Sequence, residues 1–333
     1  MTQKSDEEQK PEVEAAEEDY LLPGPVREAH IAGHPFTKDK QLLQTPGTTA
    51  MYHAVLRCVR RRDRGYAVYC PSTGGKSRAI NVLIAMFRKA HPHVVVLKTQ
   101  AIDHGQPSEN ALWLDILTSQ QAKVGRAAAA MRATLVKLLT AATDVHGGEE
   151  IVLFVDEAQE WPAEHWRFMK GLVNTLQESY DIWMLVVPVG QTPLIRVRED
   201  IKELEEQGED LMTRFMNDLQ PLLPLRSKDD VVAILSQFDS PAFNVYPAGS
   251  ACCYSKFFLP QAYANGWRLA AQANHIWAAL SQIKRNKRMP SMRHLMGLVR
   301  EFLLNAQDAP DFRAGKAAWM TALQATSYAN RAD

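Results

Sequence analysis

Short apolar runs alternate with segments of helical spacing along the middle of the chain. Two runs, HVVVL (93–97) after its first residue and IVLFV (151–155), are continuously apolar, which is typical of strands buried on both faces of a parallel sheet. The predicted strands are Tyr66–Tyr69, His93–Leu97, Ile151–Val155, Ile182–Val189 and Leu219–Leu225. The predicted helices are Met51–Arg62, Ser77–Ala90, Asn110–Leu117, Ala127–Thr143 and Ala163–Ser179. This alternation indicates an α/β domain with a five-stranded parallel sheet flanked by helices.

The pattern changes on both sides of that domain. Residues 1–48 are first acidic and then rich in Pro and Gly, and they predict an extended N-terminal arm. The α/β core is predicted to span residues 49–226, and a small helical lid subdomain residues 227–306. The lid helices are predicted at Asp229–Phe238, Pro260–Arg285 and Ser291–Ala306, with residues 239–258 irregular. Residues 307–333 are weakly patterned, and the sequence assigns them no role.

Composition excludes several classes of protein. Hydrophobic residues make up 46% of the 333 residues and charged residues 23%, which is ordinary for a globular protein and excludes global disorder. The four cysteines show neither zinc-ligand spacing nor a disulfide framework. No apolar run is long enough to span a bilayer, and the N-terminus is acidic rather than signal-like. These features predict a reducing, cytoplasmic location with no membrane partner.

The net charge of zero hides an asymmetry. Residues 1–20 carry eight acids against two lysines, so that 36 basic and 30 acidic residues remain in the rest of the chain. The rest therefore carries a charge of about +6, which permits a polyanionic partner without requiring one.

A predicted phosphate-binding loop lies between the first strand and its helix. Residues 70–77 read CPSTGGKS, against the pattern G-x-x-x-x-G-K-[ST], and Cys70 replaces the first glycine. The predicted ATP-binding residues are Pro71, Ser72, Thr73, Gly74, Gly75, Lys76 and Ser77. Backbone amides and the helix N-terminus would hold phosphate oxygens, Lys76 would reach the β- and γ-phosphates, and the hydroxyl of Ser77 would hold Mg²⁺. The alternative is a glycine-rich turn that caps an ordinary helix.

Two carboxylates follow the third predicted strand. Asp156 and Glu157 come directly after IVLFV, roughly eighty residues beyond the phosphate loop. At the end of a strand beside that loop, Asp156 is expected near Mg²⁺, and Glu157 is expected to polarise the attacking water as general base. The alternative is that one of the two carboxylates caps the following helix.

These motifs resemble those of AAA+ ATPases, and more closely those of the TnsC/TniB group of DNA-transposition regulators. Five segments carry the resemblance: YCPSTGGKS (69–77), IVLFVDEAQEW (151–161), VVPVGQTPL (186–194), LMTRFMNDLQPLLPL (211–225) and MPSMRHLMGLVREFL (289–303). The residues DEAQ (156–159) and the pattern RF…L.PL within residues 211–225 point to this group and to its relatives, including IstB-like helpers and secretion ATPases. The compact length also resembles the short TnsC proteins of CRISPR-associated transposons.

The resemblance implies Mg²⁺-dependent ATP hydrolysis and roles for three further residues. Gln191 matches the sensor-one position, which orients the attacking water, although it could also be a turn residue. Arg214 matches the arginine finger that reaches a neighbour's ATP, with Arg196 and Arg198 as rival candidates. Arg293 matches the sensor-two arginine that the lid lays over the γ-phosphate. The alternative for each arginine is an ordinary solvated side chain.

The resemblance also implies partners. Proteins of this group form rings or helical filaments on double-stranded DNA, and they connect a TniQ-like target-selection protein to transposase subunits. The candidates for contact with the DNA backbone are Lys98, Thr99, Arg167 and Lys170, whose alternative role is simple solubility. Residues 60–64 and 284–288 are denser basic runs that serve equally well as solvated helix ends. Two other functions stay open: a non-hydrolysing ATP-gated scaffold, and an ATPase of IstB-like or secretion type with another partner.

Overall fold

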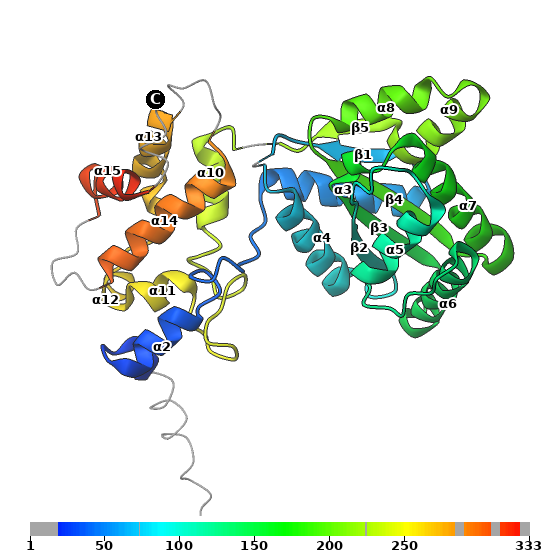
Figure 1. Cartoon of the computed structure of the whole chain (residues 1–333). Coiled ribbons are helices and arrows are strands. Elements are labelled where there is room, and N and C mark those ends of the chain that lie inside the picture. The colour runs from blue at the N-terminus through cyan, green and yellow to red at the C-terminus, as the bar shows by residue number, and fades with distance from the viewer. Residues whose placement is uncertain (1–18, 73, 224, 284–289, 308–313, 327–333) are drawn as a thin grey trace, which may run out of the picture. The chain divides into compact units, whose positions relative to one another are not determined.

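The computed structural model describes residues 19–72, 74–223, 225–283, 290–307 and 314–326 (Figure 1). Most of the acidic stretch and the basic run 284–288 therefore lie outside the described residues. The chain divides into two compact units. The α/β unit spans residues 46–224, and the helical unit combines the chain up to residue 45 with the chain from residue 225 onward. The structure thus groups residues 19–45 with the C-terminal part, whereas the sequence predicts three separate segments there.

The α/β unit contains a five-stranded sheet in which every pairing is parallel. The strand order is β2-β3-β4-β1-β5. The strands are β1 (Tyr66–Tyr69), β2 (Val95–Gln100), β3 (Glu150–Asp156), β4 (Trp183–Gly190) and β5 (Asp218–Pro221). The predicted α/β class and the five-stranded parallel sheet are confirmed.

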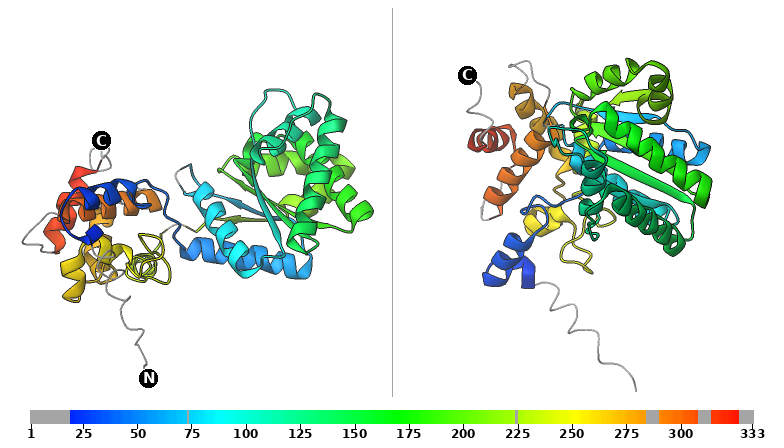
Figure 2. Two further views of the ribbon diagram at one scale, coloured as in Figure 1. Left: turned by 90° about the horizontal axis from the view of Figure 1, so that it is seen from below. Right: turned by 45° about the vertical axis from the view of Figure 1, so that its right-hand side comes forward.

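Helices cover both faces of the sheet (Figures 1 and 2). They are α3 (Pro46–Arg61), α4 (Lys76–Ala90), α5 (Glu109–Ser119), α6 (Ala128–His146), α7 (Ala163–Tyr180), α8 (Leu194–Lys202) and α9 (Glu205–Leu211), followed by a π-helical turn (Met212–Met216). Successive residues of β3 point to opposite faces of the sheet. Leu153 belongs to the core under α5, α6 and α7, and Phe154 belongs to the core under α3 and α4. A strand buried on both sides must be apolar at every position, which is why IVLFV has no alternation.

The parallel order brings the candidate residues to one end of the sheet. Tyr69 pairs with Gly190, and Asp156 pairs with Val189, so the strand ends that precede the phosphate loop, Glu157 and Gln191 are neighbours. The π-helical turn with Arg214 comes immediately before β5. It therefore lies at the opposite, amino end of the sheet.

Strands β2 and β5 differ most from the predicted strands. Strand β2 begins at Val95 and continues to Gln100, because Lys98 and Thr99 pair with Phe154 and Val155 of β3. Both residues thus lie inside the strand and not beyond it. Strand β5 ends at Pro221, and Leu225 belongs to the core of the helical unit.

The helical unit joins segments from the two ends of the chain. Its helices are α2 (Pro25–Gly33), α10 (Lys228–Leu235), α11 (Tyr254–Phe258), α12 (Pro260–Ala264), α13 (Ala273–Ile283), α14 (Met292–Ala306) and α15 (Lys316–Ala325), with 3-10 turns at Asp19–Leu21 and Ala270–Gln272. The prediction of an extended segment before residue 48 is wrong for α2, in which Pro25 occupies the first turn, where proline is tolerated. The buried Arg27 donates to the carbonyl of Phe258 at 3.0 Å, and Arg300 donates to that of Phe36 at 3.1 Å.

The predicted helix Pro260–Arg285 is interrupted in the structure. Helix α12 ends at a turn in which Gly266 has φ +87°, and the amide of Trp267 bonds back to the carbonyl of Ala262 at 2.9 Å. The chain then re-enters a helix under Asp239, whose two carboxylate oxygens each accept a backbone amide at 2.9 Å, from Leu269 and Ala270. The Asn-Gly pair at 265–266 is a turn signal that the apolar periodicity concealed.

A buried histidine lies at the centre of the helical unit. The ring of His34 is 4.4–4.7 Å from the ring centroids of Tyr246, Tyr254, Phe257 and Phe258. Its Nδ1 accepts the amide of Phe36 at 3.0 Å. Burial among these rings lowers the pKa of His34 to about 3, so the imidazole is neutral at physiological pH.

Candidate functional site

The phosphate loop continues directly from β1 into α4. The amide of Cys70 donates to the carbonyl of Gly190 at 3.1 Å, which ties the loop to the end of β4. A turn between Pro71 and Gly74 (2.9 Å) then leads to Gly75, the N-cap of α4, which has no side chain to bond the first amides of the helix. Such a helix N-terminus is suited to phosphate oxygens. Pro71 and Ser72 are exposed beside it, and the predicted Thr73 lies outside the described residues.

Cys70 occupies the position where the motif has its first glycine. A side chain at Gly74 would place its Cβ 2.5 Å from the sulfur of Cys70, so the buried thiol fills the space beside the second half of the loop. Burial raises the pKa of Cys70 to about 11, although the charge of Lys76 lowers it in part. The thiol is therefore neutral at physiological pH and has a packing role.

Two ammonium groups face the two carboxylates that follow β3. The nearly buried Lys76 has its Nζ 3.6 Å from Oε1 of Glu157. Lys98, on the neighbouring strand, has its Nζ 2.9 Å from Oδ2 of the buried Asp156. The formal charges of the two ammonium groups and the two carboxylates balance at this end of the sheet. The pairing assigns Lys98 to this site, although the sequence made it a candidate for DNA contact.

Glu157 is held by two glutamine side chains. Its Oε2 accepts Nε2 of Gln159 at 2.7 Å and Nε2 of Gln191 at 3.0 Å. Burial by itself would raise the pKa of Glu157, but these hydrogen bonds and the charge of Lys76 together lower it. The backbone of Glu157 has φ +53°, an uncommon conformation for this residue type that turns the chain sharply at the end of β3. The structure thus places Gln191 against Glu157, where a water-orienting residue is expected.

The donor set suits Mg²⁺. Asp156 offers carboxylate oxygens and the exposed Ser77, in the first turn of α4, offers a hydroxyl. Among the residues that the structure describes, no group of three or more His, Cys, Asp or Glu side chains could hold a metal ion. Mg²⁺ commonly binds one or two protein oxygens and takes its other ligands from substrate phosphates and water, so the donors of Asp156 and Ser77 fit this ion.

Arg214 belongs to a second polar cluster at the amino end of the sheet. Its Nε bonds Oδ1 of Asp210 at 2.8 Å, and its NH1 bonds the side-chain oxygen of Asn174 at 2.8 Å. Lys170 pairs with the other oxygen of Asp210 at 2.5 Å. Burial would raise the pKa of Asp210, but the hydrogen bonds from Lys170 and Arg214 lower it. Lys170, one of the four candidates for DNA contact, thus pairs with the same carboxylate as Arg214, the predicted arginine finger.

The rival arginines on α8 are less suited to the finger role. Arg198 donates to the carbonyl of Met216 at 2.9 Å, so its guanidinium is bound to the backbone of the π-helical turn. Arg196 is exposed on the same helix. Arg293 is exposed in the first turn of α14, in the helical unit. Its sensor-two role stays a prediction.

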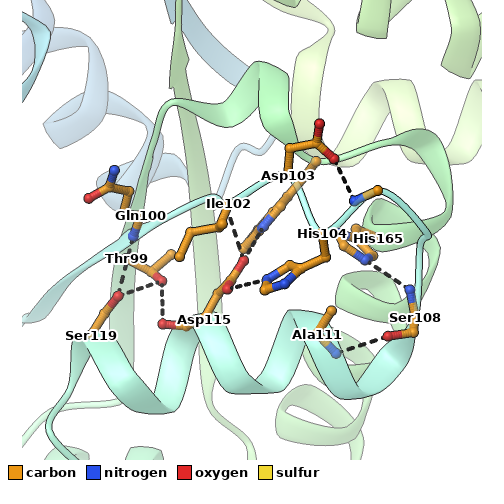
Figure 3. Close-up of polar contacts among 12 residues, drawn as sticks. Thr99, Gln100, Ile102, Asp103, His104, Ser108, Ala111, Asp115, Ser119 and His165 are labelled. Carbon is orange, nitrogen blue, oxygen red and sulfur yellow. Dashed lines mark hydrogen bonds and ion pairs between the residues drawn. The ribbon is translucent and has the colours of Figure 1, made fainter.

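Thr99 is a correction to the expected DNA contacts. Its side chain is fully buried, and its hydroxyl bonds the carbonyl of Asp115 at 3.2 Å and the hydroxyl of Ser119 at 3.1 Å (Figure 3). A strand residue that faces a packed helix cannot reach a phosphate. Arg167, by contrast, is exposed on α7 beside Lys170, where both line a surface depression.

A buried carboxylate holds the loop that follows β2. One oxygen of Asp115 accepts Nε2 of His104 at 2.8 Å, and the other accepts the amide of Ile102 at 3.2 Å (Figure 3). That second oxygen also accepts the indole N–H of the buried Trp161 at 2.9 Å. Asp115 therefore connects the loop after β2 to the segment after Glu157. The sequence analysis missed it, although an acid flanked by Leu112, Trp113 and Ile116 on a helix was a usable signal.

No family model matches the chain, and no curated protein matches it. Solved structures share its fold. The ORC2 protein of Aeropyrum pernix, in its ADPNP-ADP complexes, matches with a TM-score of 0.58 at 14% identity, over 89% of this chain and 71% of that one. The ADP form of the same protein matches with a TM-score of 0.50 at 13% identity, over 85% and 68% of the two chains.

The chain therefore shares its fold with this ORC2 protein. At 14% identity the likeness concerns the fold alone. It agrees with the AAA+ part of the resemblance seen in the sequence and does not single out the TnsC/TniB group. Among the described residues, no helix is long and apolar enough to cross a membrane.

Proposed function

We propose that the chain binds ATP at the phosphate loop and hydrolyses it. One observation carries this proposal: the carboxylate of Glu157 is held by Gln191 and lies 3.6 Å from the ammonium of Lys76, at the end of β3 beside the loop. The lowered pKa keeps this carboxylate ionised at neutral pH, and an ionised carboxylate beside the loop can accept a proton from water. The ORC2 protein with the same fold was solved with ADPNP and ADP, which supports a nucleotide as ligand.

Each residue of the site has a role in this scheme. The amides at the start of α4 bind phosphate oxygens, and Lys76 neutralises charge on the transferred phosphoryl group. Ser77 and Asp156 would hold Mg²⁺, which when bound neutralises charge on the β- and γ-phosphates. Gln191 orients the attacking water, and Glu157 takes its proton.

Arg214 fits a role in a second copy of the chain. The turn that carries it precedes β5, whereas the phosphate loop follows β1, so the two lie at opposite ends of a parallel sheet. An arginine at that end is remote from its own subunit's phosphates. Head-to-tail contact with a neighbour would bring it to the neighbour's ATP and would make the active form a ring or helical filament.

The resemblance to transposition regulators suggests what the oligomer does. We infer that it assembles on double-stranded DNA, receives a TniQ-like target-selection protein, recruits transposase subunits, and disassembles on hydrolysis. Arg167 is the remaining exposed candidate for a phosphate contact, with Lys170 beside it. One contact per subunit, repeated along a filament, would suffice for binding that does not depend on sequence.

Steady-state ATP turnover with Mg²⁺ tests the catalytic proposal. We expect Glu157→Gln to lower turnover by about 10²- to 10⁴-fold, the contribution of a general base, and to leave ATP binding intact. We expect Lys76→Ala to weaken binding as well. Glu164→Gln, at an exposed glutamate on α7, is the matched control and should leave both unchanged. Equal turnover in Glu157→Gln and wild type would overturn the mechanism, and tight ATP binding without turnover would favour a static scaffold.

Particle size tests the assembly proposal. Light scattering and negative-stain imaging with duplex DNA should show large assemblies only when ATP and Mg²⁺ are present. Mixing Glu157→Gln with Arg214→Ala should restore part of the turnover that each lacks, because some interfaces then combine an intact Glu157 with an intact Arg214. No recovery on mixing would exclude a finger acting between subunits. ATP-dependent assembly without DNA would favour an ATPase with another partner.

A further inference from the structure

Gln159 lies two residues beyond Glu157, and the proposed function gives it no role. It belongs to the 3-10 turn Ala158–Glu160 that follows β3. Its Nε2 donates to Oε2 of Glu157 at 2.7 Å and to Oε1 of Glu160 at 2.9 Å. Its Oε1 accepts the backbone amide of Gln191 at 2.7 Å. Both hydrogens of the amide nitrogen and the carbonyl oxygen are therefore engaged.

The amide of Gln159 lies close against the end of β4. A Cβ built on Gly190 would lie 2.8 Å from Oε1 of Gln159. A side chain at position 190 would therefore push the end of the Gln159 side chain away from its bond to the amide of Gln191.

The turn that carries Gln159 is anchored at both ends. At its start, the amide of Ala101 donates to the carbonyl of Asp156 at 2.9 Å. At its end, the indole of the buried Trp161 donates to Asp115, the carboxylate that also binds His104 (Figure 3). Gln159 therefore projects from a fixed backbone, and its hydrogen bonds can hold Glu157 in one orientation.

We propose that Gln159 is a positioning residue for ATP hydrolysis, which holds the carboxylate of Glu157 against the side chain of Gln191; this inference rests on the proposed function. Gln159 bonds the same oxygen of Glu157 that Gln191 bonds, and it also fixes the backbone of Gln191. The base and the water-orienting residue are thereby locked to each other. Loss of the amide frees the carboxylate of Glu157 to rotate away from Gln191.

Gln159→Met tests this role, because methionine keeps the length of the side chain and removes every hydrogen bond. We expect kcat for ATP to fall on the order of 10-fold, because small misplacement of a reacting group costs rate, while KM changes by less than about 2-fold. Gln159→Ala should behave alike. Gln261→Ala, at an exposed glutamine in the helical unit, is the control and should change none of these.

A second measurement does not depend on turnover. The backbone amide of Gln191, followed by ¹H–¹⁵N NMR, loses its hydrogen-bond acceptor in Gln159→Met and should exchange its hydrogen faster than in the wild type, while the amides of β4 keep their rates. An unchanged exchange rate at Gln191 overturns the inference, and so does faster exchange with an unchanged kcat. A fall in kcat that accompanies a general loss of thermal stability assigns Gln159 a merely structural role. A wild-type chain without ATP turnover would instead overturn the proposed function, and with it this role.

Discussion

The two units of the chain use buried polar groups in opposite ways. In the α/β unit, Lys76 and Lys98 pair with Glu157 and Asp156, so charge meets charge at the end of the sheet. In the helical unit, the neutral His34 is enclosed by aromatic rings. Paired charges can exchange partners when a charged ligand binds, whereas the neutral ring of His34 supports the core by packing and by accepting one backbone amide. The comparison indicates that the paired charges suited to a charged ligand lie in the α/β unit, and that His34 serves the stability of the helical unit.

The units also differ in how the chain builds them. The α/β unit is one continuous stretch, and its site comes from residues that directly follow neighbouring strands. The helical unit joins two stretches separated by about 180 residues of the α/β unit. A substitution that changes the stability or activity of one unit and leaves the other unchanged would support this comparison. A substitution that changes both units would contradict it.

The largest expected effect is on catalysis. Arg214→Ala should lower ATP turnover by about 10³-fold, as loss of an arginine finger does, with no change in the protection of α14 in hydrogen exchange. Asp210→Asn should cost less, because Asn174 still binds the guanidinium. Exchange protection that falls in both units along with turnover would mean that Arg214 acts through stability.

A core substitution in the helical unit should have the reverse effect. Trp319 is fully buried on α15, and its ring stacks on Phe302 of α14 with centroids 3.7 Å apart. Trp319→Ala should destabilise this unit by about 3–5 kcal/mol. Hydrogen exchange should quicken in α14 and remain slow in α4. Equal acceleration in α4 would show that the two units unfold as one, and the comparison would fail.

Acid should weaken the helical unit through His34. Its pKa is lowered in the folded chain to about 3, against 6.5 in the unfolded chain, so the unfolded state binds more protons between these values. The stabilisation is therefore complete above pH 6.5 and declines as the pH falls, by about 1.4 kcal/mol at pH 5.5. Exchange in α14 followed from pH 7.5 to 5.5 measures this decline. His34→Phe should flatten the dependence, and an unchanged slope would place the titrating group elsewhere.

The smallest effect is expected at Cys70. Cys70→Ala removes a sulfur packed beside Gly74, and should cost about 1 kcal/mol of stability while ATP turnover stays within about 3-fold. Thermal unfolding and turnover together measure this. Cys58→Ala, on α3, is the matched control. A large loss of turnover would show that the thiol shapes the phosphate loop and does more than fill space.

Local patterns predicted the parts of the site that follow strands. The motif of residues 70–77 and the carboxylates after IVLFV predicted the residues of the proposed nucleotide site, because each strand end positions its next residues through backbone geometry. The partners of side chains on neighbouring strands were harder to predict. Lys98 was a candidate for contact with DNA, and in the structure it pairs with Asp156. Its partner depends on β2 lying next to β3, which the order of elements along the chain does not determine.

Local patterns were enough to predict the fold class, the glycine-rich loop after β1 and the two carboxylates at the end of β3, because apolar runs and small-residue turns act over a few residues. Three contacts emerge only in the folded chain: residues 19–45 pack with the C-terminal helices, Asp210 joins Lys170 to Arg214, and Gln159 holds Glu157. The first contact joins two segments that the whole α/β unit separates along the sequence. The other two depend on the direction in which side chains point. A buried polar group must find its partner wherever packing places one, and that place is a property of the whole fold.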